Sequence, residues 1–256
     1  MPAFTLYGGR TFPAVARVTI ALDEAGFTDY ELKGVDVMAG ENKVSSISSI
    51  PRITIHVTNA FSQTPEFLAI SPYGKVPTLV TSSGAPIYES RAIAKYLARA
   101  YPSHFSSLVP DPSDPVAVAR FEQAEQLEIA YFSEPMGRIA LELFYKQFIP
   151  MGPPDMEAVE REKKVVLRHL DVCEGLLGDA DAGGFMGGKE FGLVDIFYAP
   201  FFARLFDCGM AGEVESRPNV KAWWERVKSR PAVKRYLDES PTVEMYKEMM
   251  AKRNKA

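Results

Sequence analysis

Two neighbouring polar residues, Glu89 and Ser90, lie where a strand-like run of the sequence gives way to a helical one. The first N–H groups of a helix have no acceptor within the helix, so a serine hydroxyl and N–H at that point can together hold a carboxylate. The glutamate beside it can receive an ammonium group. Ser90 can equally be an ordinary helix cap, and the two roles are compatible because the free N–H groups of a cap are the anion site.

The elements that position this pair alternate between strand and helix over the first hundred residues. Strand patterns cover 4–7, 30–37, 76–80 and 85–88, and helical spacing covers 14–25, 64–68 and 90–100. Gly26 is the expected C′ residue of the first helix, and Thr64 and Pro65 are the expected N-cap and first residue of the second. The order β-α-β-α-β-β-α predicts a compact α/β unit with helices covering a small sheet.

The rest of the chain reads as helical. A proline-rich stretch up to Pro115 suits a linker between domains. Beyond it, helical patterns cover 121–145 with a break near Pro135, 155–177, the almost wholly apolar 194–206, 219–228, and a shorter helix that begins at 233. An α/β head followed by an all-helical body is therefore expected.

Composition narrows the function classes. The 256 residues are 46% apolar and carry a formal net charge of −4, which offers no basic surface for nucleic acid. We find no apolar run long enough for a membrane span and no signal-peptide pattern, so we expect a cytoplasmic protein. Cys173 and Cys208 lie far apart in helical segments, which fits core residues better than a disulfide framework or a metal site.

Several motifs, taken together, resemble the glutathione transferases, and above all their phi class. In that class N-P-[FY]-G-x-V-P precedes [FY]-E-S-R-A-I, and in the helical domain [ST]-x-x-D and P-x-[VL]-x-x-W begin two helices. The order and spacing carry the resemblance, since each motif alone is weak. The matching residues here are Leu6–Gly8, Arg17, Ala21–Gly26, Ser71–Leu79, Tyr88–Ile93, Phe191–Asp195 and Asn219–Trp223.

The resemblance implies an α+β protein of two domains. Residues 1–102 would form a thioredoxin-like βαβαββα domain that binds glutathione, 103–115 a linker, and 116–256 an all-α helical bundle, usually assembled as a homodimer. The implied reaction joins glutathione, the co-substrate, to a small apolar electrophile, without a metal. A glutathione-dependent carrier with little turnover, or peroxidase or ether-cleaving activity at the same site, are the alternatives.

The resemblance also assigns residues to glutathione. A cis Val76–Pro77 bond would let the Val76 backbone pair with the cysteinyl part of glutathione, the alternative being a trans proline at a strand edge. Glu89 and Ser90 would hold the γ-glutamyl end, and Lys43 the glycyl carboxylate. Asn42 stands where the family prefers histidine, which weakens one contact. Further contacts are expected from Phe12, Lys75 and Arg91.

The catalytic position departs from the family. Phi enzymes carry a serine five residues before the arginine that corresponds to Arg17, and Phe12, which cannot donate a hydrogen bond, stands there. Thr11 could supply the hydroxyl, backbone N–H groups of 11–14 could stabilise the thiolate, or Tyr7 could act as tyrosines do in other classes. If none does, the protein binds glutathione and catalyses little. No cysteine lies nearby, which argues against the cysteine-dependent branches of the family.

Aromatic and apolar residues on the long helix are candidates for the second-substrate pocket. Tyr131, Phe132 and Met136 would face the glutathione site if the family arrangement holds. Residues of this kind at helical spacing are also typical of a core.

Residues 44–63 interrupt the family pattern. Without these residues the sequence reads Gly-Glu-Asn-Lys-Thr-Pro-Glu-Phe-Leu, which resembles the family pattern at this point. Codons for Val44, Gln63 and the Thr58-Asn59 pair can spell intron donor, acceptor and branch-site signals, so we hypothesise a translated intron. The alternative is a genuine insertion in which 52–57 pairs as a strand or crosses the mouth of the site, and loops tolerate such length thermodynamically.

Overall fold

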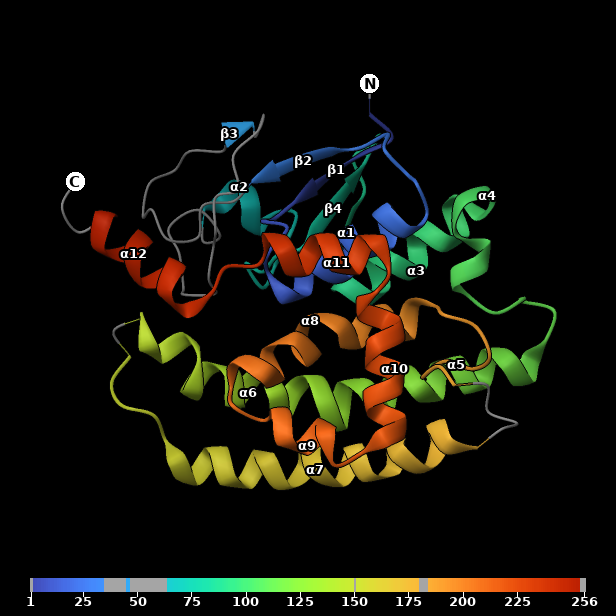
Figure 1. Ribbon diagram of the computed structural model, residues 1–256. Helices are drawn as coiled ribbons and strands as arrows, with labels where there is room; N and C mark the ends of the chain where they lie inside the picture. The colour runs from blue at the N-terminus through green and yellow to red at the C-terminus, as the bar shows by residue number, and fades with distance from the viewer. Residues whose placement is uncertain (1, 35–44, 47–63, 150, 180–183, 254–256) are drawn as a thin grey trace. The chain divides into compact units, whose positions relative to one another are not determined.

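The computed structural model describes residues 2–34, 45–46, 64–149, 151–179 and 184–253. The chain folds as two compact units, Met1–Ser106 (unit 1) and Ser107–Ala256 (unit 2), which are described separately (Figure 1). The stretch 103–115, expected to be a linker, contains most of helix α4 (Pro102–Phe105) and the 3₁₀ turn η2 (Ser106–Leu108), and α5 begins at Pro115.

Unit 1 is built on a mixed five-stranded sheet in the order β3-β2-β1-β4-β5. β1 runs parallel to β2 and antiparallel to β4, and β4 and β5 form a hairpin. Four of the strands lie in the predicted runs, and the fifth, β3, consists of two residues within the interrupting stretch. The strands are β1 (Phe4–Tyr7), β2 (Glu31–Gly34), β3 (Ser45–Ser46), β4 (Thr78–Thr81) and β5 (Pro86–Tyr88).

The helices of unit 1 confirm the predicted order. α1 (Pro13–Glu24) and α3 (Ser90–Ala100) pack together against the sheet. α2 (Pro65–Leu68) is capped as expected, because the Thr64 hydroxyl accepts the Phe67 N–H at 3.2 Å. Gly26 follows α1 with φ of +61°, a conformation that glycine adopts at little cost.

The regular elements among the described residues of unit 2 are helices, apart from an isolated β-bridge between Phe185 and Gly188. The predicted long helix over 121–145 is α5, a π-helical turn η3 and α6 in succession. The break lies just ahead of Pro135, whose ring nitrogen has no hydrogen to donate to the preceding turn. The elements are α5 (Pro115–Glu128), η3 (Ile129–Ser133), α6 (Glu134–Leu143), η4 (Tyr145–Gln147), α7 (Met156–Gly178), α8 (Leu193–Asp207), α9 (Ala211–Glu215), α10 (Pro218–Lys228), α11 (Pro231–Glu239) and α12 (Val243–Arg253).

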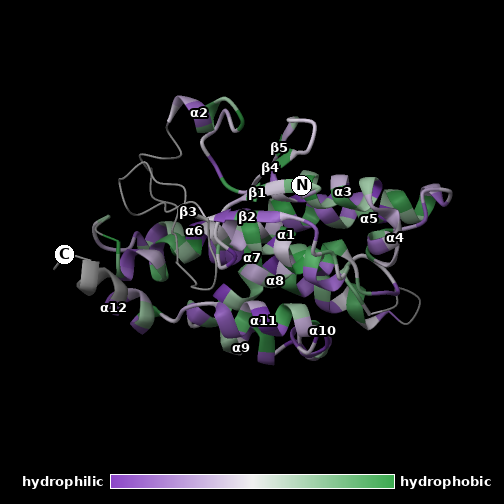
Figure 2. Ribbon diagram, turned by 90° about the horizontal axis from the view of Figure 1, so that it is seen from above, coloured by the Kyte–Doolittle hydropathy of each residue, from purple (hydrophilic) through white to green (hydrophobic). Residues whose placement is uncertain are grey.

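Helix α8 forms the centre of unit 2. It packs against α5, α6, α10 and α11, and most of its side chains are buried, as its apolar sequence predicts. Outer helices such as α10 show hydrophilic and hydrophobic bands in alternation (Figure 2). The buried Asp195 carboxylate fixes the start of α8, because it accepts the N–H groups of Met186 and Gly192 and the indole N–H of Trp223 at 2.7 Å.

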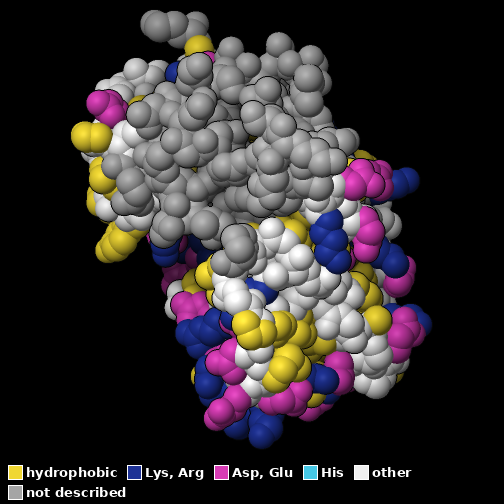
Figure 3. All heavy atoms as spheres, turned by 90° about the vertical axis from the view of Figure 1, so that its left-hand side faces the viewer, with side chains coloured by type: hydrophobic (Ala, Val, Ile, Leu, Met, Phe, Trp, Pro, Cys, Tyr) yellow, Lys and Arg dark blue, Asp and Glu magenta, His cyan; other side chains and the backbone are white. Residues whose placement is uncertain are grey.

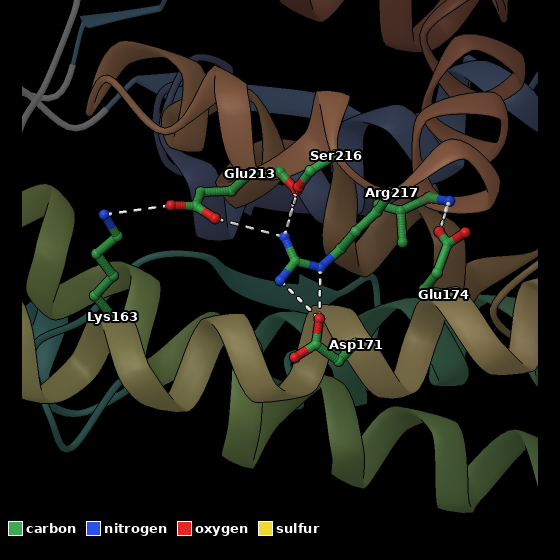
Figure 4. A network of polar contacts seen from close by, with 7 residues as sticks. Lys163, Asp171, Glu174, Glu213, Ser216 and Arg217 are labelled. Carbon is green, nitrogen blue, oxygen red and sulfur yellow. Dashed lines mark hydrogen bonds and ion pairs between the residues drawn. The ribbon is translucent and has the colours of Figure 1, made fainter.

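A polar network ties α7 to α9 and α10 (Figure 4). The Arg217 guanidinium binds Asp171 on α7 and Glu213 on α9, and Glu213 also pairs with Lys163. Beside it, the Glu174 carboxylate on α7 accepts the first N–H groups of α10, and Arg217, the N-cap residue of α10, makes no side-chain cap. α10 therefore takes its cap from a different helix.

Figure 3 shows how charged side chains are distributed over the described part of one face. On the described part of the face in Figure 3, Lys and Arg side chains are interspersed with Asp and Glu. Among the described residues no helix is long and apolar enough to cross a membrane, and no group of three or more metal-ligating side chains gathers.

Candidate functional site

Strand register brings three segments of unit 1 to one edge of the sheet. Thr78 at the start of β4 pairs with Tyr7 at the end of β1 and with Tyr88 at the end of β5. The residues just before Thr78 therefore lie beside those that follow Tyr7 and those that follow Tyr88. Val76–Pro77, the turn into α1, and Glu89–Ser90 meet at this edge.

The Val76–Pro77 peptide bond is cis, as predicted. The loop ahead of it is fixed by hydroxyls: Ser71 Oγ bonds the Lys75 N–H at 3.2 Å and carbonyl at 2.9 Å, and Thr78 Oγ1 donates to the same carbonyl. The Lys75 side chain is exposed. The Val76 N–H and C=O make no hydrogen bond with the described residues, so this backbone pair is available to an extended peptide.

Gly8 allows the start of α1 to approach the loop that holds Val76. It has φ of +142°, and a Cβ at this position would lie 2.6 Å from a Val15 methyl and 3.4 Å from the Val76 Cβ. No larger residue fits without displacing Val15. The close approach places Val76 and the first turn of α1 side by side.

Phe12 is the N-cap residue of α1, and its side chain does not face outward. It is 3% exposed and packs in a cluster with Val15, Phe67 and Val76, against which Tyr7 also lies. Any contact of Phe12 with a ligand at this edge would therefore fall to its backbone. Tyr7, considered above as a thiol activator, contributes its ring to the same apolar cluster.

Thr11 carries an unsatisfied hydroxyl. Its Oγ1 is buried and has no hydrogen-bond partner among the described residues. The N–H groups of Ala14 and Val15, in the first turn of α1, likewise make no hydrogen bond with the described residues. Unsatisfied donors and the positive end of a helix dipole thus gather where a thiolate could be stabilised.

The other helix start at this edge belongs to Ser90. Ser90 is the first residue of α3, and neither its hydroxyl nor its N–H bonds to a described residue. Glu89 is exposed and has φ of +71°, a left-handed conformation that is costly for a residue with a Cβ. Such strain is typical of functional positions. Arg91 follows, half-buried and engaged in other interactions.

Two predicted contact residues, Asn42 and Lys43, lie outside the described residues. The three candidates on the long helix belong to unit 2, where Phe132 and Met136 are fully buried. The Phe132 ring packs on Tyr198 and Phe202 of its own unit, and only Tyr131 is exposed, by 50%. Phe132 and Met136 thus lack the exposed surface that contact with a substrate requires.

The two cysteines occupy the core and its margin, as their helical positions predicted. Burial raises the pKa of the Cys173 thiol to about 12, so this thiol stays protonated at neutral pH. Cys208 is half-buried, and burial raises its thiol pKa to about 12 as well. Neither thiol therefore forms an appreciable amount of the nucleophilic thiolate at neutral pH.

In the sequence, Ser71, Thr78 and Gly8 stand out only as members of the family motifs, which assign them no role in the site. Ser71 and Thr78 hold the Lys75 backbone, and Gly8 permits the close approach of Val15. A serine four residues before Lys75 was a readable turn signal. No local pattern indicated that position 8 has no room for a side chain, because the residue that fills the space, Val15, comes from α1.

Family models match both units. Residues 13–100 match the model described as glutathione S-transferase, N-terminal domain, and residues 156–239 match the one described as glutathione S-transferase, C-terminal domain.

Curated relatives that match over most of their own length are also glutathione S-transferases. Glutathione S-transferase 3 of Zea mays is 30% identical over 94% of this chain and 96% of its own length. Glutathione S-transferase hmp2 of Hypomyces subiculosus is 33% identical over 70% of this chain and 82% of its own length. The solved structure of glutathione S-transferase III in apo form superposes with a TM-score of 0.74 at 30% identity, covering 94% of this chain and 98% of that one. Glutathione transferase F7 from Populus trichocarpa, with a TM-score of 0.76 at 24% identity, covers 93% and 99% and shares the fold.

Proposed function

The chain belongs to the glutathione S-transferase family, within which it is similar to the phi class, and we propose that it binds glutathione at the edge where Val76, Ser90 and the start of α1 meet. It is a transferase enzyme, and the reaction is the addition of the glutathione thiolate to an electrophile. The site must perform this reaction without the serine that is usual in the phi class, because Phe12 stands at that position.

Each end of glutathione has a complementary group in unit 1. The free Val76 N–H and C=O would pair with the cysteinyl residue in the manner of an added strand. The Ser90 hydroxyl and N–H would bind the γ-glutamyl carboxylate, with Glu89 receiving the ammonium group. Arg91 and the exposed Lys75 would border that end, and Lys43 with Asn42 would serve the glycyl end.

Thr11 is the group we assign to the thiol. The observation that carries this assignment is its unpartnered hydroxyl, beside the unsatisfied N–H groups of Ala14 and Val15. A hydroxyl donating to sulfur and the N-terminus of a helix both favour the thiolate over the thiol. Because the hydroxyl is buried, rotation about the Thr11 Cα–Cβ bond is the smallest change that would turn it toward a bound thiol.

The test compares Thr11→Val, which keeps the shape without the hydroxyl, with Thr11→Ser, which keeps the hydroxyl. Loss of one hydrogen bond to a charged sulfur corresponds to roughly tenfold or more in rate, since such bonds are worth about 1.5–3 kcal/mol. We expect Thr11→Val to raise the thiol pKa of bound glutathione, measured by thiolate absorbance, and to slow conjugation accordingly. Thr11→Ser should resemble the wild type.

If Thr11→Val shows the wild-type thiol pKa and turnover, the Thr11 hydroxyl does not activate the thiol. The backbone N–H groups at the start of α1 would then be the groups that stabilise the thiolate. A wild-type complex in which the thiol titrates as in free glutathione would instead favour a carrier with little turnover. The two results are distinguishable because only the second concerns the wild type.

The remaining assignments concern the partners. We propose a small apolar electrophile as second substrate, with Tyr131 the one exposed candidate among the three residues of the long helix. We further propose a cytoplasmic homodimer, as is usual in the family. The exposed aromatic pair Tyr73 and Tyr88, whose rings meet edge to face at 6.1 Å, offers an apolar contact for a second copy.

A further inference from the structure

A guanidinium lies buried in unit 2 with one of its edges unpartnered. Arg204, near the end of α8, is 3% exposed. Its Nη1 donates to Asp207, and its plane lies over the Phe144 ring, 4.3 Å from the centroid. Its Nε and Nη2 have no hydrogen-bond partner among the described residues. Buried charged donors left unsatisfied are among the costliest features a folded protein can carry, so this edge calls for a partner.

Two further unsatisfied groups come from α11 and the residue that follows it. The Tyr236 hydroxyl and the Ser240 hydroxyl are both buried and without a partner among the described residues. α11 packs against α8, and the Tyr236 phenol interacts electrostatically with Arg204. Ser240 lies one helical turn after Tyr236, at the end of α11. Three of the four unsatisfied atoms thus belong to α8 and α11, which pack together, and the fourth belongs to the residue that directly follows α11.

Aromatic rings border the same guanidinium. Phe144 contacts its face, the Tyr145 hydroxyl is a hydrogen-bond partner of the guanidinium, and the Tyr246 phenol lies within electrostatic range of it. Tyr246 on α12 stacks on Phe148 with centroids 4.4 Å apart and meets Phe144 at 5.7 Å. The donors are therefore set among apolar surfaces.

The geometry of the free edge defines the ligand chemistry. Nε and Nη2 carry parallel N–H bonds, the fork that matches the two oxygens of a carboxylate. Hydroxyls can donate to the same oxygens. Asp207 already binds Nη1, so a ligand anion would be held by the Nε and Nη2 donors together with the hydroxyls, and a monoanion is less costly to desolvate there than a dianion. The surrounding rings favour an aromatic or otherwise apolar body.

We propose that Arg204, Tyr236 and Ser240 form a binding site in unit 2 for the carboxylate of a small aromatic acid. The site is separate from the residues assigned to glutathione, all of which belong to unit 1. It therefore stands or falls independently of the proposed role of Thr11.

The test is calorimetric titration of the full chain with sodium benzoate. Benzyl alcohol, which has the ring without the carboxylate, is the matched ligand control, and sodium sulfate tests an inorganic oxyanion. We expect saturable benzoate binding that is at least tenfold weaker for benzyl alcohol. Arg204→Met should weaken benzoate binding by roughly tenfold or more and Tyr236→Phe by severalfold, as expected for charged and neutral hydrogen bonds. Arg235→Met, which removes an exposed arginine of α11, should change nothing.

Absence of benzoate binding, or binding that survives both Arg204→Met and Tyr236→Phe, would overturn the proposal, as would binding of sulfate alone. Unliganded Arg204→Met should unfold at the same temperature as the wild type or higher, because it removes unsatisfied buried donors. If that variant instead fails to fold, Tyr236→Phe and Ser240→Ala decide. Unchanged benzoate affinity in both would mean that the arginine is structural.

Discussion

Ser90 sits at the first position of α3 with a hydroxyl and an N–H that no described residue engages. If these groups hold the γ-glutamyl carboxylate, Ser90→Ala removes one hydrogen bond to a charged group. We expect the Kd for glutathione, measured by calorimetry, to rise roughly tenfold, while kcat at saturating glutathione changes little. Ser90→Ala would then weaken glutathione binding, whereas Thr11→Val would raise the thiol pKa, so the two variants separate binding from thiol activation.

Ser82→Ala provides the control for the Ser90 experiment. Ser82 is exposed in the turn between β4 and β5, away from the helix start. Equal glutathione affinity in wild type and Ser90→Ala would exclude the proposed carboxylate contact.

At this scale the sequence predicts positions better than orientations. It places Phe12 where the family has its serine, and the structure shows why a phenylalanine is accommodated: the ring joins Val15, Phe67 and Val76 in the core. That outcome depends on residues from α2 and the cis-proline loop, which no local pattern brings together. Arg204 is similar, because a lone cation in an apolar run is visible in the sequence but its partners are not.

Among the elements, periodicity located four of the five strands and most of the longer helices, but it missed α4, α9, α12 and β3. α9 is too short for a helical pattern, and β3 has only two residues. The helix expected to break near Pro135 instead widens into a π turn just before it and then continues as α6. Tertiary contacts, which a local pattern does not contain, decide these cases.

The cap of α10 by Glu174 leads to a stability prediction. Its carboxylate accepts the Asn219 N–H at 3.0 Å and the Val220 N–H at 2.9 Å, at the positive end of the helix dipole. We expect Glu174→Ala to lower the free energy of unfolding by about 1–2 kcal/mol, measured by urea denaturation. Glu160 is an exposed glutamate of α7, the helix that also carries Glu174, and Glu160→Ala should lower the free energy of unfolding by less than about 0.5 kcal/mol. Equal effects of the two substitutions would contradict the capping role.

The interrupting stretch 44–63 gives a second prediction at the level of elements. We expect a chain lacking these residues to bind glutathione more tightly, because Lys43 would then directly precede the helix that begins after Thr64. Calorimetry of the two forms checks this, and equal affinity would count against it. Sequencing the transcript addresses the origin of the stretch, since an abundant message that contains it would contradict a retained intron.

For the whole molecule, two buried titratable groups of unit 2 give opposite responses to pH. Burial lowers the pKa of His169 to about 4, and its Nε2 lies 2.8 Å from the Tyr198 hydroxyl. Burial raises the pKa of Asp195 to about 6, although four N–H donors, including its own backbone N–H, act to lower it. As pH falls from about 6.5 to 4, His169 destabilises the fold, because the unfolded chain takes up the proton more readily. As pH falls from about 6 to 4, Asp195 stabilises it, because the folded chain takes up the proton more readily.

The two responses should largely cancel in the wild type and separate in variants. We expect His169→Gln to gain stability relative to the wild type by up to about 1.4 kcal/mol for each pH unit below 6.5. Urea denaturation at pH 7, 5.5 and 4.5 measures the difference. His104→Gln, which removes an exposed histidine of unit 1, is the control for loss of a histidine. If the free energies of unfolding of His169→Gln and the wild type change in parallel with pH, the folded protein does not hold His169 as a neutral imidazole.

The cap of α10 also bears on how unit 2 assembles. Glu174 and Asn219 are 45 positions apart in the chain, so the first turn of α10 has its acceptor only once α7 has docked. Before α7 docks, the first N–H groups of α10 have only water as acceptor, so ordering this turn costs backbone entropy without the gain of the cap. A fragment that begins after α7 should therefore leave the start of α10 frayed. Formation of one helix is thereby coupled to the docking of another, and the unit is built to gain or lose its order cooperatively.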